Sequence, residues 1–169
     1  MPIDLEHDLA AITRQESALM LPVFDAETAW QLGNLVRQIA VERNYRIVID
    51  IRRFGSPYQP LFYTAFPGTT PDNFRWVERK ANTVARFHRS SYAMGLRLAQ
   101  AGVSFSEKYS LPDADYATHG GSFPLAVSGA GIVGSLTISG LTQREDHELA
   151  VEALCLFTDR NFDDYRLPS

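Results

Sequence analysis

A short glycine-rich segment carries residue types well suited to chemistry in this 169-residue chain. His119 stands directly before Gly120 and Gly121, and Ser122 follows them. An imidazole ionises near neutral pH and can act as a general acid or base. Adjacent glycines allow backbone N–H groups to approach a ligand carboxylate, but a plain turn before a strand needs the same freedom. A functional loop and a structural turn therefore both remain open here.

A second group of candidate residues lies on the longest helical pattern, which begins near residue 73. At about 100° per residue its side chains form two stripes. The first is expected to face the core and contains Phe74, Val77, Ala81, Val84 and His88. The second contains Trp76, Lys80, Thr83 and Phe87. It is expected either to pack against another subunit, as aromatic side chains often do, or to line a pocket for a planar or anionic ligand.

Other motifs favour structural interpretations. The glycines at 129, 131 and 134 match G-x-G-x-x-G but precede a strand pattern, which indicates a hairpin turn rather than a dinucleotide site. The four histidines lack the spacing of a zinc site, so no metal is expected. Asp146, His147 and Glu148 follow a capping box, which indicates a solvated helix start. Cys155 stands among apolar residues and is expected to be a small buried hydrophobe.

The elements that must position these residues follow from periodicity and turn signals. Helices are predicted over 3–18, 25–44 and 73–100, and a last helix from a Thr142 capping box to 157. The helix over 73–100 is expected to break near the Ser90-Ser91 pair or Gly95. Strands are predicted over 19–24 at a sheet edge and over 45–51 with one face mostly buried. The second of these is expected to form an antiparallel hairpin with 61–66, and 123–127 is expected to form another with 132–139. Residues 103–116 are predicted to be a surface connection with one short helix or strand, and 160–169 a loosely held tail.

Composition limits the class of protein. Apolar residues make up 45% of the chain and charged residues 21%, with a formal net charge of −4. These values are typical of one soluble globular domain spanning 1–169, and no basic run is long enough for a nucleic-acid backbone. The single cysteine and the absence of an apolar leader pattern predict a cytoplasmic protein that does not associate with membranes.

Several motifs, taken in order, resemble the GlcG/HbpS-like haem-degrading-domain superfamily. They are Lys80-Ala81-Asn82-Thr83-Val84, the His119-to-Leu125 loop, the Gly131-to-Leu141 strand ending in Ser-Gly, and the acidic helix start from Glu145 to Ala150. Together with Trp76, Arg79 and Ser90-Ser91, they look like the uncharacterised branch of that superfamily.

The resemblance implies an α+β fold, with an antiparallel sheet of about five strands flanked by helices as in profilin-like and GlcG-like proteins. It also implies a homo-oligomer, either a dimer or a ring of dimers, and it suggests haem as a cofactor. Because no histidine is matched by a recognisable axial partner, we expect weak or no haem binding.

Three functions stay open: a small-molecule-binding oligomer, an enzyme of small-molecule or haem metabolism with His119 as acid or base, and a structural oligomer without a ligand. The residues expected to contact a ligand are Trp76, Lys80, Thr83, His119, Gly120, Gly121 and Ser122.

Overall fold

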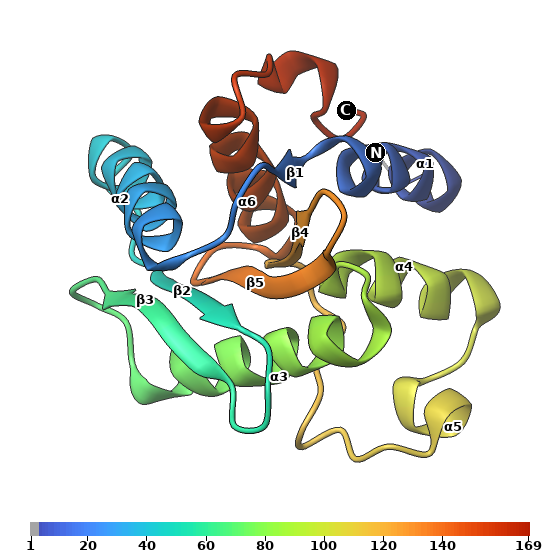
Figure 1. Ribbon diagram of the computed structural model, residues 1–169. Coiled ribbons are helices and arrows are strands. Elements are labelled where there is room, and N and C mark those ends of the chain that lie inside the picture. Colours follow the sequence, from blue (N-terminus) through green and yellow to red (C-terminus); the bar gives the residue numbers. More distant parts are fainter. Residues whose placement is uncertain (1–3) are drawn as a thin grey trace.

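The computed structural model describes residues 4–169, so Ile3, where the first helix was predicted to begin, lies outside the described residues. The elements are α1 (Leu5–Ala18), β1 (Met20–Leu21), α2 (Ala26–Glu42), β2 (Val48–Arg53), β3 (Gln59–Ala65), α3 (Pro71–Phe87), α4 (Ser91–Ala101), α5 (Phe105–Tyr109), β4 (Ser122–Val127), β5 (Gly131–Ser139), α6 (Gln143–Phe157) and the 3-10 helix η1 (Phe162–Asp164). This is the predicted α+β order of elements, and Figure 1 shows the sheet between its flanking helices.

The five strands form one sheet in the order β1-β4-β5-β2-β3. Three neighbouring pairs are antiparallel, including the predicted hairpins β2–β3 and β4–β5. The short strand β1 lies at the edge, as Pro22 beside it indicates, but it pairs in parallel with β4. The sheet is therefore mixed: the predicted antiparallel pairing holds for three of the four neighbouring pairs, and the edge strand β1 is the parallel exception. A two-residue strand carries too little pattern to reveal its direction.

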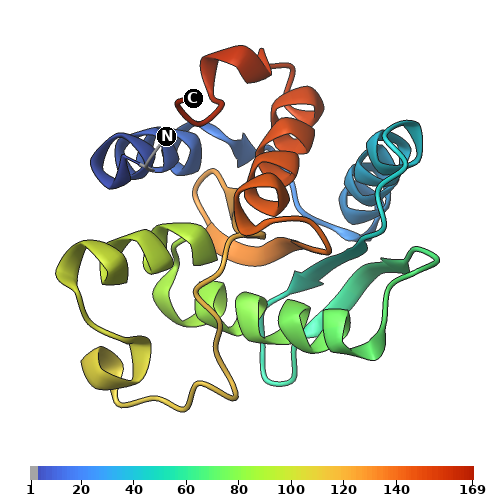
Figure 2. The same ribbon diagram turned by 180° about the vertical axis from the view of Figure 1, so that it is seen from behind.

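Helices cover both faces of the sheet. Helices α2 and α6 pack on one face, and their apolar residues join Ile49 and Ile51 of β2 in the main core. Helix α3 runs across the opposite face, with α4 following it (Figures 1 and 2). We expected one mostly buried face for β2, yet both are buried, because α3 covers Asp50 and Arg52. These two side chains pair at 2.7 Å, which compensates their burial.

The long helical pattern is interrupted where the Ser90-Ser91 pair predicts a break. Helix α3 ends at Phe87, its C-cap residue His88 adopts a left-handed conformation with φ 53°, and Ser90 caps α4. His88 was predicted to be a core histidine, but it is exposed. Because the helix ends at Phe87, His88 does not lie on the core-facing stripe of α3, and its ring does not enter the core.

The C-terminal segment 160–169 is packed rather than loosely held. Leu167 is buried beside α1 and α4, and its N–H donates to Glu148 at 3.0 Å. Gln15 of α1 donates to the Tyr165 carbonyl at 2.6 Å. These polar contacts to distant elements have no periodic sequence signal, which explains the wrong prediction.

Within the described part of the chain, none of the helices has the length and apolar character needed to cross a membrane.

Candidate functional site

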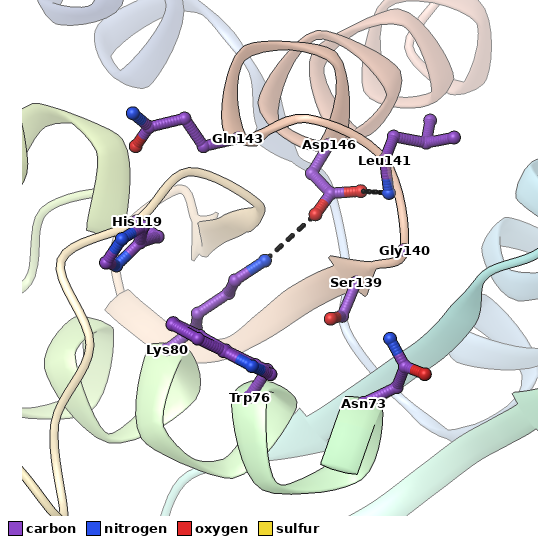
Figure 3. Close-up of a pocket in the computed structure, with 9 residues that line it drawn as sticks. All are labelled: Asn73, Trp76, Lys80, His119, Ser139, Gly140, Leu141, Gln143 and Asp146. Atoms are coloured by element: carbon purple, nitrogen blue, oxygen red, sulfur yellow. Dashed lines mark hydrogen bonds and ion pairs between the residues drawn. The ribbon is translucent and has the colours of Figure 1, made fainter. Parts of the chain in front are cut away.

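A cleft of about 250 Å³ opens where α3, the end of β5 and the start of α6 meet. Figure 3 shows its lining, to which α3 contributes three side chains and the loop before β4 contributes one. The lining residues are Asn73, Trp76, Lys80, His119, Ser139, Gly140, Leu141, Gln143 and Asp146. We call this hollow the Lys80 cleft.

Lys80 lies at the floor of the cleft and is 3% exposed. Its Nζ donates to Asp146 Oδ2 at 2.9 Å and to the Ile138 carbonyl at 3.0 Å. An ammonium carries three N–H donors, so in residues 4–169 one donor of Lys80 has no protein acceptor. Burial lowers the pKa of Lys80, while the Asp146 carboxylate opposes that change.

Asp146 is the partner that neutralises this ammonium. Its side chain is buried, and its Oδ1 accepts the Leu141 N–H at 3.0 Å (Figure 3). Burial raises the pKa of Asp146, against the lowering effect of Lys80 and of backbone N–H donors. Because the two charges cancel, the floor of the cleft is a neutral ion pair. Lys80 therefore offers no net positive charge to the anionic ligand that was one of the two expectations for its stripe.

Local sequence explains how Asp146 reaches the cleft. Gly140 has φ +149° and lies so close to the neighbouring chain that a Cβ would stand 2.4 Å from the Arg46 carbonyl oxygen. This glycine permits the tight connection from β5 to α6. The capping box of Thr142 and Glu145 then starts α6, which places Asp146 in its first turn.

The solvated helix start predicted for residues 146–148 was wrong. Asp146 and His147 are buried, and His147 Nε2 lies 2.8 Å from Gln15 Oε1. The available signal was helical spacing, since Asp146 precedes the buried Leu149 and Ala150 by three and four residues. The capping box favoured the solvent-exposed interpretation. It marks where the helix begins, but it does not indicate which face of the first turn is buried.

His119 and Trp76, two of the residues expected to contact a ligand, form one wall of the cleft. Their ring centroids are 4.9 Å apart in an edge-to-face arrangement. Arg79 lies over the Trp76 ring at 4.7 Å. Partial burial lowers the pKa of His119, and the charges of Lys80 and Arg79 lower it further. The imidazole is therefore neutral at pH 7 and can donate from one nitrogen and accept at the other.

The two glycines after His119 make room for the ion pair. Gly121 has φ +130°, and a Cβ there would lie 2.3 Å from the Ile138 oxygen and 2.7 Å from Lys80 Nζ. The Gly120 N–H points to the Gln143 side-chain oxygen, at 3.4 Å. The close backbone approach anticipated for this loop thus serves contacts within the chain.

Two predicted ligand contacts lie behind the cleft wall. Thr83 is buried and donates to the Ala117 carbonyl at 2.8 Å. The Ser122 hydroxyl lies 2.8 Å from Thr137 Oγ1, and its N–H donates to Ser91 Oγ. Both hold the loop from residue 117 to 122 in place. The residues that sequence reasoning missed are Asn73, Ser139, Gly140, Leu141, Gln143 and Asp146.

Phe87, the last member of the second stripe, is covered by its own chain. Its ring lies 5.9 Å from that of Phe105 and 4.6 Å from that of Tyr109 in α5. Trp76 likewise has neighbours within the chain. In the second stripe, Trp76 therefore lines the cleft, Lys80 and Thr83 are buried polar residues, and Phe87 belongs to an aromatic cluster.

The remaining motifs have structural roles. The glycine-rich stretch is the β4–β5 turn, with φ near 80° at Gly129 and Gly131. Cys155 is a free thiol buried in the core, as predicted, and burial raises its pKa to about 11, which disfavours the reactive thiolate. In residues 4–169 no three His, Cys, Asp or Glu side chains gather as metal ligands.

The fold and cleft define a class: an α+β protein with a five-stranded mixed sheet and a small polar cleft at the junction of α3 and α6. Residues 24–155 match the sequence profile of the family described as haem degrading protein HbpS-like. The chain belongs to this family. The match covers most of the chain and confirms the resemblance found in the sequence motifs.

Similar proteins agree with this assignment. A "UPF0303 protein" of Acidobacterium capsulatum is 57% identical over 166 residues, covering 98% of this chain and 99% of the relative. The crystal structure of Ybr137w protein has a TM-score of 0.84 and 30% identity, covering 93% and 91% of the two chains. A PduOC:heme complex has a TM-score of 0.66 at 18% identity, covering 79% and 94%, and shows likeness of fold alone.

Proposed function

We propose that this protein binds a small polar molecule in the Lys80 cleft. The observation that carries the proposal is a buried ammonium at the floor of an open hollow, with one N–H donor left for a ligand. Convergent polar groups in a concave site are the usual mark of a binding site. Here an imidazole, two side-chain amides and a hydroxyl surround the ion pair.

The lining defines the ligand chemistry. An oxygen acceptor, from a carbonyl or a carboxylate, suits the free N–H of Lys80, and a flat group suits the indole of Trp76. The cleft of about 250 Å³ is slightly below the ~300–1,000 Å³ of pockets for drug-sized ligands. We therefore favour a compact metabolite with few carbon atoms over an extended one.

Haem is the second candidate ligand, because the family description names haem degradation. The residues of the Lys80 cleft do not fit it. Trp76 and Leu141 are the large apolar side chains of the lining, whereas a porphyrin needs apolar walls on both faces. The cleft also contributes a single imidazole, which is engaged edge to face with Trp76. Haem binding in this family member would need a different surface.

An enzyme of small-molecule metabolism is a second candidate function. The neutral imidazole of His119 at the cleft wall favours it, because a group with this protonation state can move protons at neutral pH. We further propose that the protein acts as a cytoplasmic homo-oligomer without nucleic-acid partners. A free buried thiol and the absence of a basic run support the location and the lack of nucleic acid.

Trp76 supplies a direct test, because Trp30 is the other tryptophan of the chain and is 60% exposed on α2. Trp30→Phe leaves Trp76 as the single indole reporter in the cleft. Titration with a panel of two- to six-carbon carboxylic, 2-oxo and hydroxy acids is expected to give a saturable change in its emission.

The matched variant Trp76→Phe keeps the distant reporter and should show no change. Native mass spectrometry of protein purified from its host identifies any retained molecule, which is then added to the panel. If neither the panel nor a retained molecule changes Trp76 emission in folded protein, the proposal is refuted.

A further inference from the structure

Lysine is rare among the basic residues of this chain. Lys80 and Lys108 are the two lysines among 16 basic residues, and the other 14 are arginines. Arginine is the usual choice for a buried ion pair, because its guanidinium is weakly hydrated and binds carboxylates through two donors. The buried pair between Arg52 and Asp50 follows that rule. Lys80 is the exception, and it stands at the floor of the cleft.

An amine differs from a guanidinium in one chemical respect that matters here. It can lose its proton and become a nucleophile, whereas arginine stays protonated in proteins. A desolvated lysine beside a proton acceptor is the arrangement that activates an amine. Asp146 Oδ2 lies 2.9 Å from Nζ, and the Leu141 N–H fixes the other carboxylate oxygen.

Lys80 lines the cleft, whereas the backbone of the glycine loop packs closely against the other side of its nitrogen. Gly121 carries no side chain, and a Cβ there would stand 2.7 Å from Nζ. Trp76, His119 and Gln143 line the same hollow around the Lys80 side chain (Figure 3). Burial also lowers the pKa of Lys80 and raises that of Asp146, and both changes ease proton transfer between them.

We propose that Lys80 captures carbonyl compounds, either small aldehydes or 2-oxo acids, as a reversible imine at the floor of the cleft. This inference rests on the proposed function, since it names the ligand class of the same site. It assigns to Lys80 a covalent role that a binding site based on hydrogen bonds does not require.

The reaction balances without an oxidant or reductant. Asp146 accepts a proton from the ammonium, and the nitrogen lone pair attacks the carbonyl carbon while the C=O π electrons move to oxygen. A proton then moves from the attacking nitrogen, which carries a positive charge after the attack, to that oxygen, and this transfer gives a neutral carbinolamine whose nitrogen again has a lone pair. Loss of its hydroxyl as water, with the proton supplied from Asp146, breaks the C–O bond and forms the C=N bond. His119 at the cleft wall is placed to relay protons to and from solvent.

Reductive trapping tests this proposal on the wild-type protein. Folded protein is incubated at pH 7 with glyoxylate or propanal and sodium cyanoborohydride, which reduces an imine to a stable secondary amine. Peptide mass spectrometry then compares Lys80 with the exposed Lys108 as an internal standard. We expect Lys80 to be modified at least tenfold faster, although it is 3% exposed, and the preference to vanish in concentrated urea.

Two variants form a matched pair. Lys108→Arg should keep the trapped adduct, and Lys80→Arg, which retains a cation beside Asp146, should lose it. If Lys80 in folded wild-type protein is modified no faster than Lys108, the inference is overturned whatever the variants do. Binding of non-carbonyl acids to the Trp76 reporter without any trapping would refute the imine alone, whereas absence of both would also refute the proposed function.

Discussion

The ion pair between Lys80 and Asp146 should be energetically coupled to a degree that a double-mutant cycle can measure. The two side chains are 4% and 3% exposed and lie 2.9 Å apart. Replacing one partner leaves the other as an unpaired charge inside the protein, which costs about 3–5 kcal/mol. We therefore expect Lys80→Met and Asp146→Asn each to lower the free energy of unfolding by about that amount.

This loss is large compared with the whole stability of a domain, which is about 5–15 kcal/mol. A domain of this length changes its Tm by about 2–4 °C per kcal/mol, so each single variant should melt about 6–20 °C lower. The double variant carries no buried charge at this position. Its loss should therefore be well below the sum of the two single losses, with a coupling energy of about 2 kcal/mol or more.

Urea denaturation of the wild type, the two single variants and the double variant provides the measurement. The exposed pair of Arg75 and Glu78 is the control cycle, and its coupling should stay below about 1 kcal/mol. If the losses at Lys80 and Asp146 add, or if each single variant loses less than about 1 kcal/mol, the pair is not the buried unit that the geometry indicates.

Further expectations concern other parts of the molecule. Burial lowers the pKa of His147 to about 3, so below the unfolded value near 6.5 the unfolded chain binds a proton that the folded chain does not. Stability should therefore fall by about 1.4 kcal/mol per pH unit from about pH 6.5 down towards pH 3, and urea midpoints in His147→Gln should show a smaller slope. Gly121→Val should lower the Tm by several degrees through its positive φ and contact with Ile138, whereas His119→Ala, at an exposed position, should change stability by less than about 0.5 kcal/mol. Sedimentation velocity at micromolar concentration should show at least a dimer, and a monomer would contradict the proposed assembly. Haem titration should give no sharp Soret band at one haem per chain; a stoichiometric band lost on a single histidine substitution would show that the fit argument is wrong.

Local signals accounted for most of the fold. The β4–β5 hairpin was predictable because its glycines adopt positive φ at the turn, and α6 was predictable because Thr142 and Glu145 form a capping box. Each signal spans a few residues and depends little on the rest of the chain. The parallel pairing of β1 with β4 was not predictable in this way, since the register of two residues is set by a partner more than 100 positions away.

The same distinction explains the candidate site. Trp76, Lys80 and His119 could be selected because aromatic, amine and imidazole groups stand out by type. Their partner Asp146 lies 66 positions from Lys80, and nothing local distinguishes it from an ordinary acidic residue in a helix start. Thr83 and Ser122 were selected by position, but their hydroxyls satisfy buried backbone and side-chain groups behind the wall. Choosing between these outcomes needs knowledge of which elements pack together.

Two buried ion pairs lie on the α3 side of the sheet, and they differ in a way that bears on function. Asp50 and Arg52 are two residues apart on one strand, so their pairing is local and stabilises the side chains that it buries. Lys80 and Asp146 come from different helices and meet at a cleft, with a donor of the ammonium still available. Asp50 also lines a hollow and Arg52 Nη1 also has no partner in the described residues, so the feature that sets the Lys80 pair apart is a cation that can lose its proton. Where a chain departs from local rules without a gain in packing, a functional site is the expected reason. The lysine at the floor of the cleft is such a departure, because arginine is the usual cation of a buried ion pair.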